Sequence, residues 1–364
     1  MWLYLRSEKS MLNKKTILPI LLLVQIVLVK MLSLFPEWIE HFYSNGLYVW
    51  ISHFSRIVLG WIPFSVGDLV YFVVIFFIGK WLWKKRKTWR LEWRGNILTI
   101  LSFISVFYFC FHMLWAMNYH RVRLFDKLNI EREYTDADLL RFTKLLIQRT
   151  NEVHSKLVAD DSSKVVIPYS QHQIFIKNVD GYRNLEKTFP YFKYEHLSAK
   201  KSLISLPLTY MGFAGYLNPF TNESQVNDEI PMYNFPTTAA HEMAHQIGYA
   251  SESEANFIGY MASIKNDDLY LQYSGYTYAL KYCLHNWKVR DEKVLDALLP
   301  TIHSGILKNY DEAEAFWNQY ETFIETGFKI FYDNFLKFNQ QKDGLESYSK
   351  FVDLLVNYYK REPF

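Results

Sequence analysis

The sequence has few cysteines and almost no excess charge, and each shortage excludes a class of protein. Its 364 residues include only two cysteines, Cys110 in an apolar run and Cys283 far along the chain. We therefore expect neither a disulfide framework nor a cysteine metal cluster. The net charge is only +3, whereas basic residues dominate a nucleic-acid-binding domain, so we expect no nucleic-acid partner.

The N-terminal region also lacks a recognisable cleavage site. Residues 1–15 form a short basic segment, which precedes an apolar run at 16–35 that is long enough to cross a bilayer. A cleaved signal peptide would need a small-x-small site after that run, and none follows. We therefore expect residues 1–15 to be a cytoplasmic N-terminus and the run to remain as a first membrane span.

Two further apolar runs, about 67–83 and 97–117, have the length and composition of transmembrane helices. The stretch between them, 84–90, is strongly basic, and the positive-inside rule places such a loop and the basic N-terminus in the cytoplasm. Three spans then carry the rest of the chain across the membrane. We predict a multi-pass membrane domain over 16–117, in contact with the lipid bilayer.

The segment between the first two spans, 36–64, mixes tryptophan and phenylalanine with polar residues. Amphipathic helices at the membrane interface would have this composition. A packed loop between two spans would have it too, so the sequence leaves both interpretations open.

Residues 118–364 are expected to form one mainly helical domain outside the cytoplasm. Thr135, followed by acidic residues and an apolar periodicity, predicts a helix that runs to about residue 157. Short β-type runs at 203–206 and 215–218 predict a small sheet. Further helices are predicted near 270–286, 292–304, 310–339 and 345–359. The fold class is therefore membrane-anchored α+β, with three transmembrane helices ahead of this domain.

The chemistry of the sequence is concentrated in the stretch His-Glu-Met-Ala-His at 241–245. On a helix, His241 and His245 lie one turn apart on the same face, so both imidazoles can reach a single metal ion. Glu242 lies beside them and is available to accept a proton from a metal-bound water. The pattern predicts a Zn²⁺ centre with Glu242 as general base and then general acid.

The residues that follow predict where this helix ends and the next begins. Gly248 can take the left-handed conformation that a helix C-terminus requires. Ser251 and Glu254 have the spacing of a capping box at the start of a second helix. We therefore expect two short helices joined by a tight turn.

If those helices fold back on one another, residues equally far from the turn lie side by side. His245 is then level with Glu252, which becomes the third metal ligand and leaves a fourth position for water. His241 is level with Asn256, which is placed to accept a hydrogen bond from the outer ring nitrogen of that histidine.

The stretch Glu-Ser-Glu-Ala-Asn at 252–256 resembles the Glu-x-x-Ala-Asp element of the gluzincin metallopeptidases. The resemblance implies that Glu252 is the third zinc ligand, and it puts Asn256 where those enzymes carry an aspartate. The whole chain resembles uncharacterised bacterial membrane proteins with a domain-of-unknown-function label and a zincin motif. This resemblance implies a zincin-like domain on the periplasmic side of a bacterial inner membrane.

In zincins, a strand ahead of the metal helix pairs with an extended peptide, and here that role falls on 215–226. We therefore predict a membrane-anchored zinc metallopeptidase that hydrolyses a peptide or protein substrate outside the cytoplasm. Two alternatives remain open: a zincin-fold membrane sensor or scaffold with little or no activity, and a zinc amidase acting on a non-peptide envelope substrate. The sequence does not identify the oxyanion donor, for which the candidates are Tyr249, His285, His303 and Tyr348.

Overall fold

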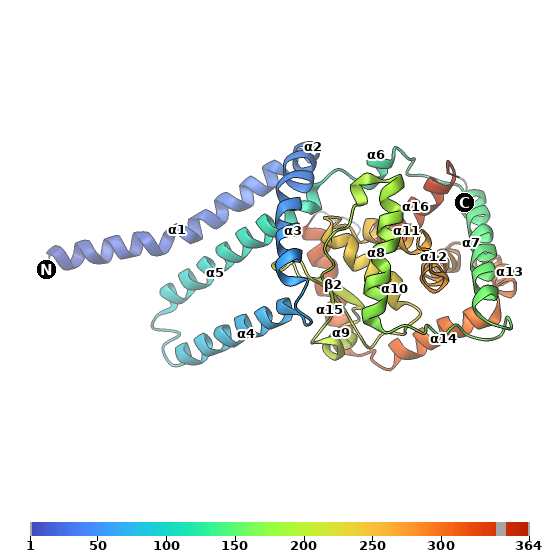
Figure 1. Ribbon diagram of the computed structural model, residues 1–364. Helices are drawn as coiled ribbons and strands as arrows, with labels where there is room; N and C mark the ends of the chain where they lie inside the picture. The colour runs from blue at the N-terminus through green and yellow to red at the C-terminus, as the bar shows by residue number, and fades with distance from the viewer. Residues whose placement is uncertain (1, 340–346, 363–364) are drawn as a thin grey trace. The chain divides into compact units, whose positions relative to one another are not determined.

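The computed structural model of the chain describes residues 2–339 and 347–362 (Figure 1). The chain divides into two compact units. Unit 1 comprises Met1–Ile51, Val66–Val122 and Pro219–Thr221. Unit 2 comprises Ser52–Ser65, Arg123–Asn218 and Asn222–Phe364.

Unit 1 is built from long apolar helices. Its elements are α1 (Trp2–Leu32), α2 (Pro36–Trp38), the π-helical η1 (Ile39–Leu47), the start of α3 (Tyr48–Leu59), α4 (Val66–Lys85), α5 (Trp93–Leu114) and the 3-10 turn η2 (Ala116–His120). Helices α1 and α5 pack against each other. The segment at 36–64 is largely helical as far as Leu59.

Two helices of unit 1, α4 and α5, are each long and apolar enough to cross a membrane. They correspond to the predicted spans at 67–83 and 97–117, although the second helix ends at Leu114. The first predicted span passes the same test only when Thr16–Leu32 is joined to Pro36–Leu59, and these segments meet at a bend of 99°. Within the described residues, two or three helices are therefore suited to span a membrane.

Residues Ser52–Ser65 belong to unit 2, although the sequence predicts one membrane domain over 16–117. The Ser52 hydroxyl donates to the carbonyl oxygen of Gln246 at 2.9 Å. Arg56 is buried, and its guanidinium lies 4.9 Å from the centre of the Tyr194 ring. These polar contacts on one face of α3 fix the segment within unit 2.

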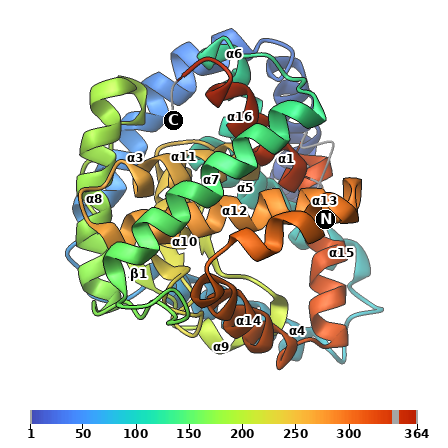
Figure 2. The ribbon, with the colours of Figure 1, turned by 90° about the vertical axis from the view of Figure 1, so that its right-hand side faces the viewer.

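Unit 2 is mainly helical, as predicted. Its helices are α6 (Leu124–Leu128), α7 (Asp136–Leu157), α8 (Gln171–Thr188), η3 (Pro190–Phe192), α9 (Ser205–Met211), α10 (Phe235–Gln246), α11 (Glu252–Ile264), α12 (Leu269–Arg290), α13 (Glu292–Leu298), η4 (Leu299–Thr301), α14 (Ser304–Asn318), α15 (Phe323–Phe338) and α16 (Ser347–Tyr359). Thr135 and Asp138 form a reciprocal capping box at the start of α7. Helix α7 packs along α12, as Figure 2 shows.

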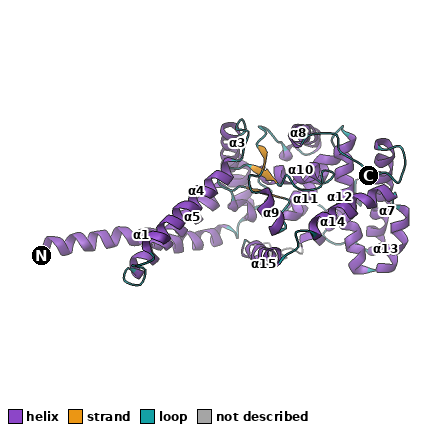
Figure 3. Ribbon diagram, turned by 90° about the horizontal axis from the view of Figure 1, so that it is seen from below, coloured by secondary structure: helices purple, strands orange, loops and turns teal. Residues whose placement is uncertain are grey.

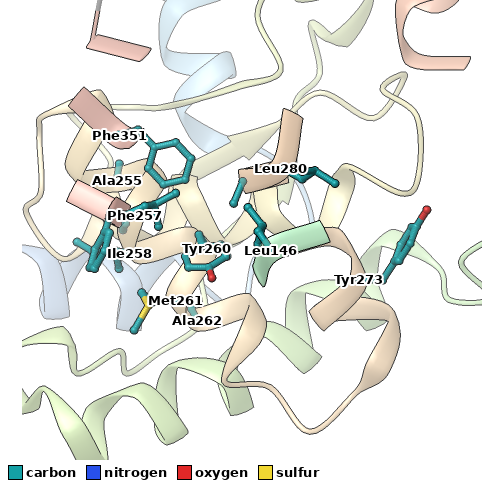
Figure 4. Close-up of a cluster of buried hydrophobic side chains, with 14 of the residues drawn as sticks. Leu146, Ala255, Phe257, Ile258, Tyr260, Met261, Ala262, Tyr273, Leu280 and Phe351 are labelled. Atoms are coloured by element: carbon teal, nitrogen blue, oxygen red, sulfur yellow. The ribbon is translucent and has the colours of Figure 1, made fainter. Parts of the chain in front are cut away.

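Helix α11 runs through the core of unit 2. Most of its side chains are fully buried, and apolar residues from α7, α12 and α16 surround them (Figure 4). The cluster includes Ala255, Phe257, Ile258, Tyr260, Met261 and Ala262 of α11 with Leu146, Leu280 and Phe351. A helix that is apolar on most of its faces is stable only when buried. The position of any polar group on α11 is therefore fixed by the core.

A three-stranded sheet packs against α10 (Figure 3). Its strands are β1 (Ala199–Lys201), β2 (Gly215–Leu217) and β3 (Ser224–Val226), in the order β1-β3-β2. β3 pairs in parallel with β1 and antiparallel with β2, so β2 is an outer strand. The strand predicted near 215–218 is present.

The strand predicted at 203–206 is wrong, because this stretch leads into α9. Pro207 falls in the first turn of α9, where its missing N–H has no helical partner to lose. Gly212, with φ of 79°, ends the helix in the left-handed conformation. The apolar alternation that favoured a strand was thus outweighed by a proline and a glycine.

Candidate metal centre

The two helices predicted around the His-Glu stretch are both present. Helix α10 ends at Gln246, and Gly248 reverses the chain with a φ of 90° while its N–H donates to the His245 carbonyl at 2.9 Å. Helix α11 then begins at Glu252, directly after Ser251. The left-handed glycine therefore ends the helix as the sequence predicts.

Close packing sets the distance between α10 and α11. A Cβ added at Gly259 of α11 would lie 2.8 Å from the His241 backbone nitrogen, so only glycine fits there. The far end of α10 is held by the Gln246 side chain, which accepts from the Tyr194 hydroxyl at 2.6 Å and donates to the Asn222 carbonyl at 2.7 Å. The histidine-bearing helix is therefore fixed along its length.

The structure brings His241, His245 and Glu252 together. The two Nε2 atoms lie 3.1 Å apart. The Glu252 carboxylate lies 3.3 Å from the Nε2 atom of His241 and 3.7 Å from that of His245. One ligating atom from each residue lies within 4.8 Å of the others. Three lone pairs thus converge on one point, as a metal ion requires.

The outer nitrogens of the two histidines have different surroundings. His245 Nδ1 lies 2.7 Å from the Tyr249 carbonyl oxygen, so its N–H donates there and Nε2 is the ring atom that faces the cluster. His241 Nδ1 is buried and has no hydrogen-bond partner within the part of the chain that the structure describes. The predicted bond from His241 to Asn256 is therefore not formed, because the Asn256 amide oxygen accepts from the Tyr278 hydroxyl at 2.7 Å.

The predicted capping box at the start of α11 is also corrected. Ser251 is the N-cap residue, but its side chain makes no cap hydrogen bond. The Glu254 carboxylate instead accepts from the backbone N–H of Leu124 at 2.8 Å, at the start of α6. The start of α6 therefore engages the Glu254 carboxylate from 130 positions away along the chain.

The electrostatics of the cluster favour a positive charge at its centre. Burial acts to lower the pKa of His245, but the carboxylates of Glu252 and Glu242 and the Tyr249 carbonyl outweigh it and raise that pKa to about 9. Burial acts to raise the pKa of Glu252, yet the two imidazoles hold it well below its usual value. A divalent cation would supply the positive charge that these groups stabilise.

Glu242 has the environment of a proton acceptor. Its side chain is buried, and its Oε2 atom has no hydrogen-bond partner among the described residues. Burial raises the pKa of this carboxyl to about 7, against the opposing effect of the two imidazoles. A Cβ added at Gly215 would lie 2.7 Å from Glu242 Oε1, so strand β2 passes directly beside the acid.

Tyr332 contacts the cluster, and the sequence analysis did not identify it. Its hydroxyl donates to Glu252 Oε1 at 2.6 Å from α15, 80 positions along the chain. Tyrosine is common in the apolar faces of these helices, and no spacing relates this one to residues 241–252, so sequence offers no signal for it.

The four residues suggested as oxyanion donors have other surroundings. The Tyr249 hydroxyl lies 3.2 Å from Lys127 Nζ, and His285 is exposed on α12. His303 lies 3.2 Å from both His154 and Asp161, a separate group. The side chain of Tyr348 lies outside the described residues.

A comparison with protein families finds one that matches most of the chain. The family described as "Protein of unknown function (DUF3810)" matches residues 43–356, a range that contains α10, α11 and the sheet. No curated protein matches the chain, and no solved structure does. The function of the chain is therefore inferred from the residues of the cluster itself.

Proposed function

The chain belongs to the DUF3810 family of unknown function, and from the geometry of its cluster we propose that it is a membrane-anchored zinc metallopeptidase. The single observation that carries this proposal is the convergence of His241, His245 and Glu252 with Glu242 buried alongside. Two imidazoles and one carboxylate are a typical ligand set of catalytic zinc.

The residues present fit Zn²⁺. The Tyr249 carbonyl orients His245 so that Nε2 faces Glu252, and the Tyr332 hydroxyl donates to Oε1 of that carboxylate. Imidazole and carboxylate ligands suit a borderline cation. With three protein ligands, one position remains for water, whose pKa a catalytic zinc lowers towards neutrality.

Glu242 would serve as the proton carrier in this proposal. A carboxyl with a pKa near 7 can accept a proton from an attacking water and then deliver it to a leaving amine. Its burial keeps it away from bulk water, which would otherwise lower that pKa. Glu242 can fill this role alone, without a second acid among the residues that contact the three ligands.

The outer strand β2 supports an extended peptide as the substrate. β2 has β3 on one side, and Gly215 brings its backbone next to Glu242. A peptide that pairs with an outer strand is held by main-chain hydrogen bonds, which places its carbonyl groups in a regular array. We propose this role for 215–226, with unit 2 outside the cytoplasm of a bacterium.

Glu242→Gln tests the proposal most simply. Peptides released from the cell envelope are compared between cells that produce the wild-type chain and cells that produce the variant, and zinc is measured in both purified proteins. We expect the variant to keep its zinc and to lose the cleavage products, because only the proton acceptor is removed.

The same comparison separates the alternatives. Products that persist in the variant with zinc bound would contradict catalysis by Glu242 and favour a sensor or scaffold. Non-peptide fragments that disappear in the variant, with peptides unchanged, would identify an amidase acting on another envelope substrate. A Glu229→Gln variant, altered at a carboxylate outside the cluster, is the control for production and handling.

A further inference from the structure

A second group of ligating side chains lies where the end of α7 meets the start of α14. His154 is in the last turn of α7, Asp161 is in the loop that follows, and His303 is the N-cap residue of α14. One ligating atom from each lies within 4.8 Å of the others. His303 Nδ1 is 3.2 Å from His154 Nδ1 and 3.2 Å from Asp161 Oδ1.

The atoms that face one another in this group are mostly hydrogen-bond acceptors. His154 Nε2 lies 2.9 Å from the Ser163 carbonyl, so its N–H donates there and its Nδ1 carries only a lone pair. His303 Nδ1 carries at most one proton, yet it faces two acceptors at equal distance. A cation at the centre would satisfy all three atoms at once.

The backbone around the group is held in place. Asn151 accepts from the His303 N–H at 3.1 Å, and the Asp161 carbonyl accepts from the Gly305 N–H at 2.9 Å. The Ser155 hydroxyl lies 3.3 Å from Asp161 Oδ1. A Cβ at Gly305 would lie 2.7 Å from His154 Nε2, so only glycine allows the two segments to approach this closely.

From this geometry we propose that His154, Asp161 and His303 bind a second Zn²⁺ ion, separate from the candidate centre on α10 and α11. His154 is buried, whereas Asp161 is 64% exposed and His303 lines a cavity of about 820 Å³ beside α7 and α13. The ion would cross-link two segments that are 149 positions apart in the chain.

The test is the zinc content of the purified full chain and of variants at each site, measured after dialysis against a weak chelator. The wild type is expected to hold about two zinc ions, and His303→Ala, Asp161→Asn and His241→Ala about one each. Asp161→Asn keeps an oxygen acceptor for Ser155, so it preserves folding while weakening the metal ligand.

Thermal melting in the His241→Ala background isolates the second site from the proposed peptidase. The melting temperature should rise with added zinc in that background and stay constant in His241→Ala/His303→Ala, since only a protein with an intact site gains stability from ligand. Equal zinc content in wild type and His303→Ala, or an equal melting response in the two backgrounds, would overturn the proposal and show adventitious zinc only. Loss of zinc in His241→Ala alone concerns the first centre and leaves this result unchanged.

Discussion

At the scale of single residues, the polar groups of the candidate centre are costly to bury, and their charges are partly balanced by one another. Glu242 and Glu252 are both carboxylates within the same buried cluster, but burial raises the pKa of one while two imidazoles lower that of the other. Carboxyls whose environments drive their pKa values apart can divide acid–base work between them. The proposed function accordingly assigns proton transfer to Glu242 and metal ligation to Glu252.

The raised pKa of Glu242 predicts that this residue destabilises the metal-free protein. Its folded-state pKa of about 7 lies above the unfolded value of 4.5, so its contribution to stability is complete below pH 4.5 and is lost as pH rises through 7. At pH 8, the free energy of unfolding of the metal-free Glu242→Gln variant should exceed that of the metal-free wild type by on the order of 2 kcal/mol. Thermal melting in detergent at pH 8 and at pH 4.5 checks this; an equal difference at both values would contradict it.

Because Tyr332 contacts a proposed ligand, its removal should weaken metal affinity although the ligands themselves are unchanged. Tyr332→Phe removes the hydroxyl that donates to Glu252, and loss of such a supporting bond weakens metal binding by about 10- to 100-fold. Tyr278→Phe is the matched control, because its hydroxyl donates to Asn256 and not to a ligand. Competition with a zinc-binding dye measures both; equal affinities in the two variants would refute a supporting role for Tyr332.

At the scale of elements, the sequence predicts the features that depend on the spacing of residues close together in the chain. Spacing along one or two helices predicts the places of His241, Glu242, His245 and the Gly248 turn. The place of Glu252 is predicted when the second helix folds back along the first. Long-range partners do not follow from spacing. The bond from Tyr278 to Asn256 and the bond from Leu124 to Glu254 cross 22 and 130 positions respectively, and they replaced the local roles that we predicted.

Because α10 and α11 approach closely at Gly259, a single added methyl group there should disturb their packing. Gly259→Ala would place a Cβ 2.8 Å from the His241 nitrogen, which forces the helices apart and separates Glu252 from the histidines. Overpacking of this kind costs about 1–3 kcal/mol. Gly327→Ala on α15 meets no atom within 4 Å and is the control. Zinc content and melting temperature should fall in the first variant alone; unchanged zinc in Gly259→Ala would contradict this packing.

At the scale of the whole molecule, composition predicts membrane helices followed by a mainly helical domain, but it does not predict the division between the units. Ser52 and Arg56 lie four residues apart on α3, with Gly60 just after the helix, and this polar and small spacing is the available sign that 52–65 packs with the later residues. The aromatic residues around it fit both an interfacial helix and a packed loop, so composition alone does not assign this segment to either unit.

The proposed orientation predicts which surface a membrane-impermeant reagent can reach in intact cells. Lys156→Cys lies exposed on α7 in unit 2, and Lys87→Cys lies exposed after α4 in the basic stretch. A polar maleimide that crosses only the outer membrane should label the first variant and not the second. The parent chain, with Cys110 and buried Cys283, is the control. Labelling of Lys87→Cys alone would reverse the orientation.

The zinc content of two acid-to-amide variants on α11 decides whether Glu252 is a ligand of the proposed centre. Glu252→Gln and Glu254→Gln are each made in the His303→Ala background, which leaves only the centre on α10 and α11, and both proteins are dialysed against the same chelator. We predict about one zinc per chain in Glu254→Gln and loss of most of it in Glu252→Gln, because only Glu252 faces the two histidines. Full zinc retention by Glu252→Gln would contradict the account.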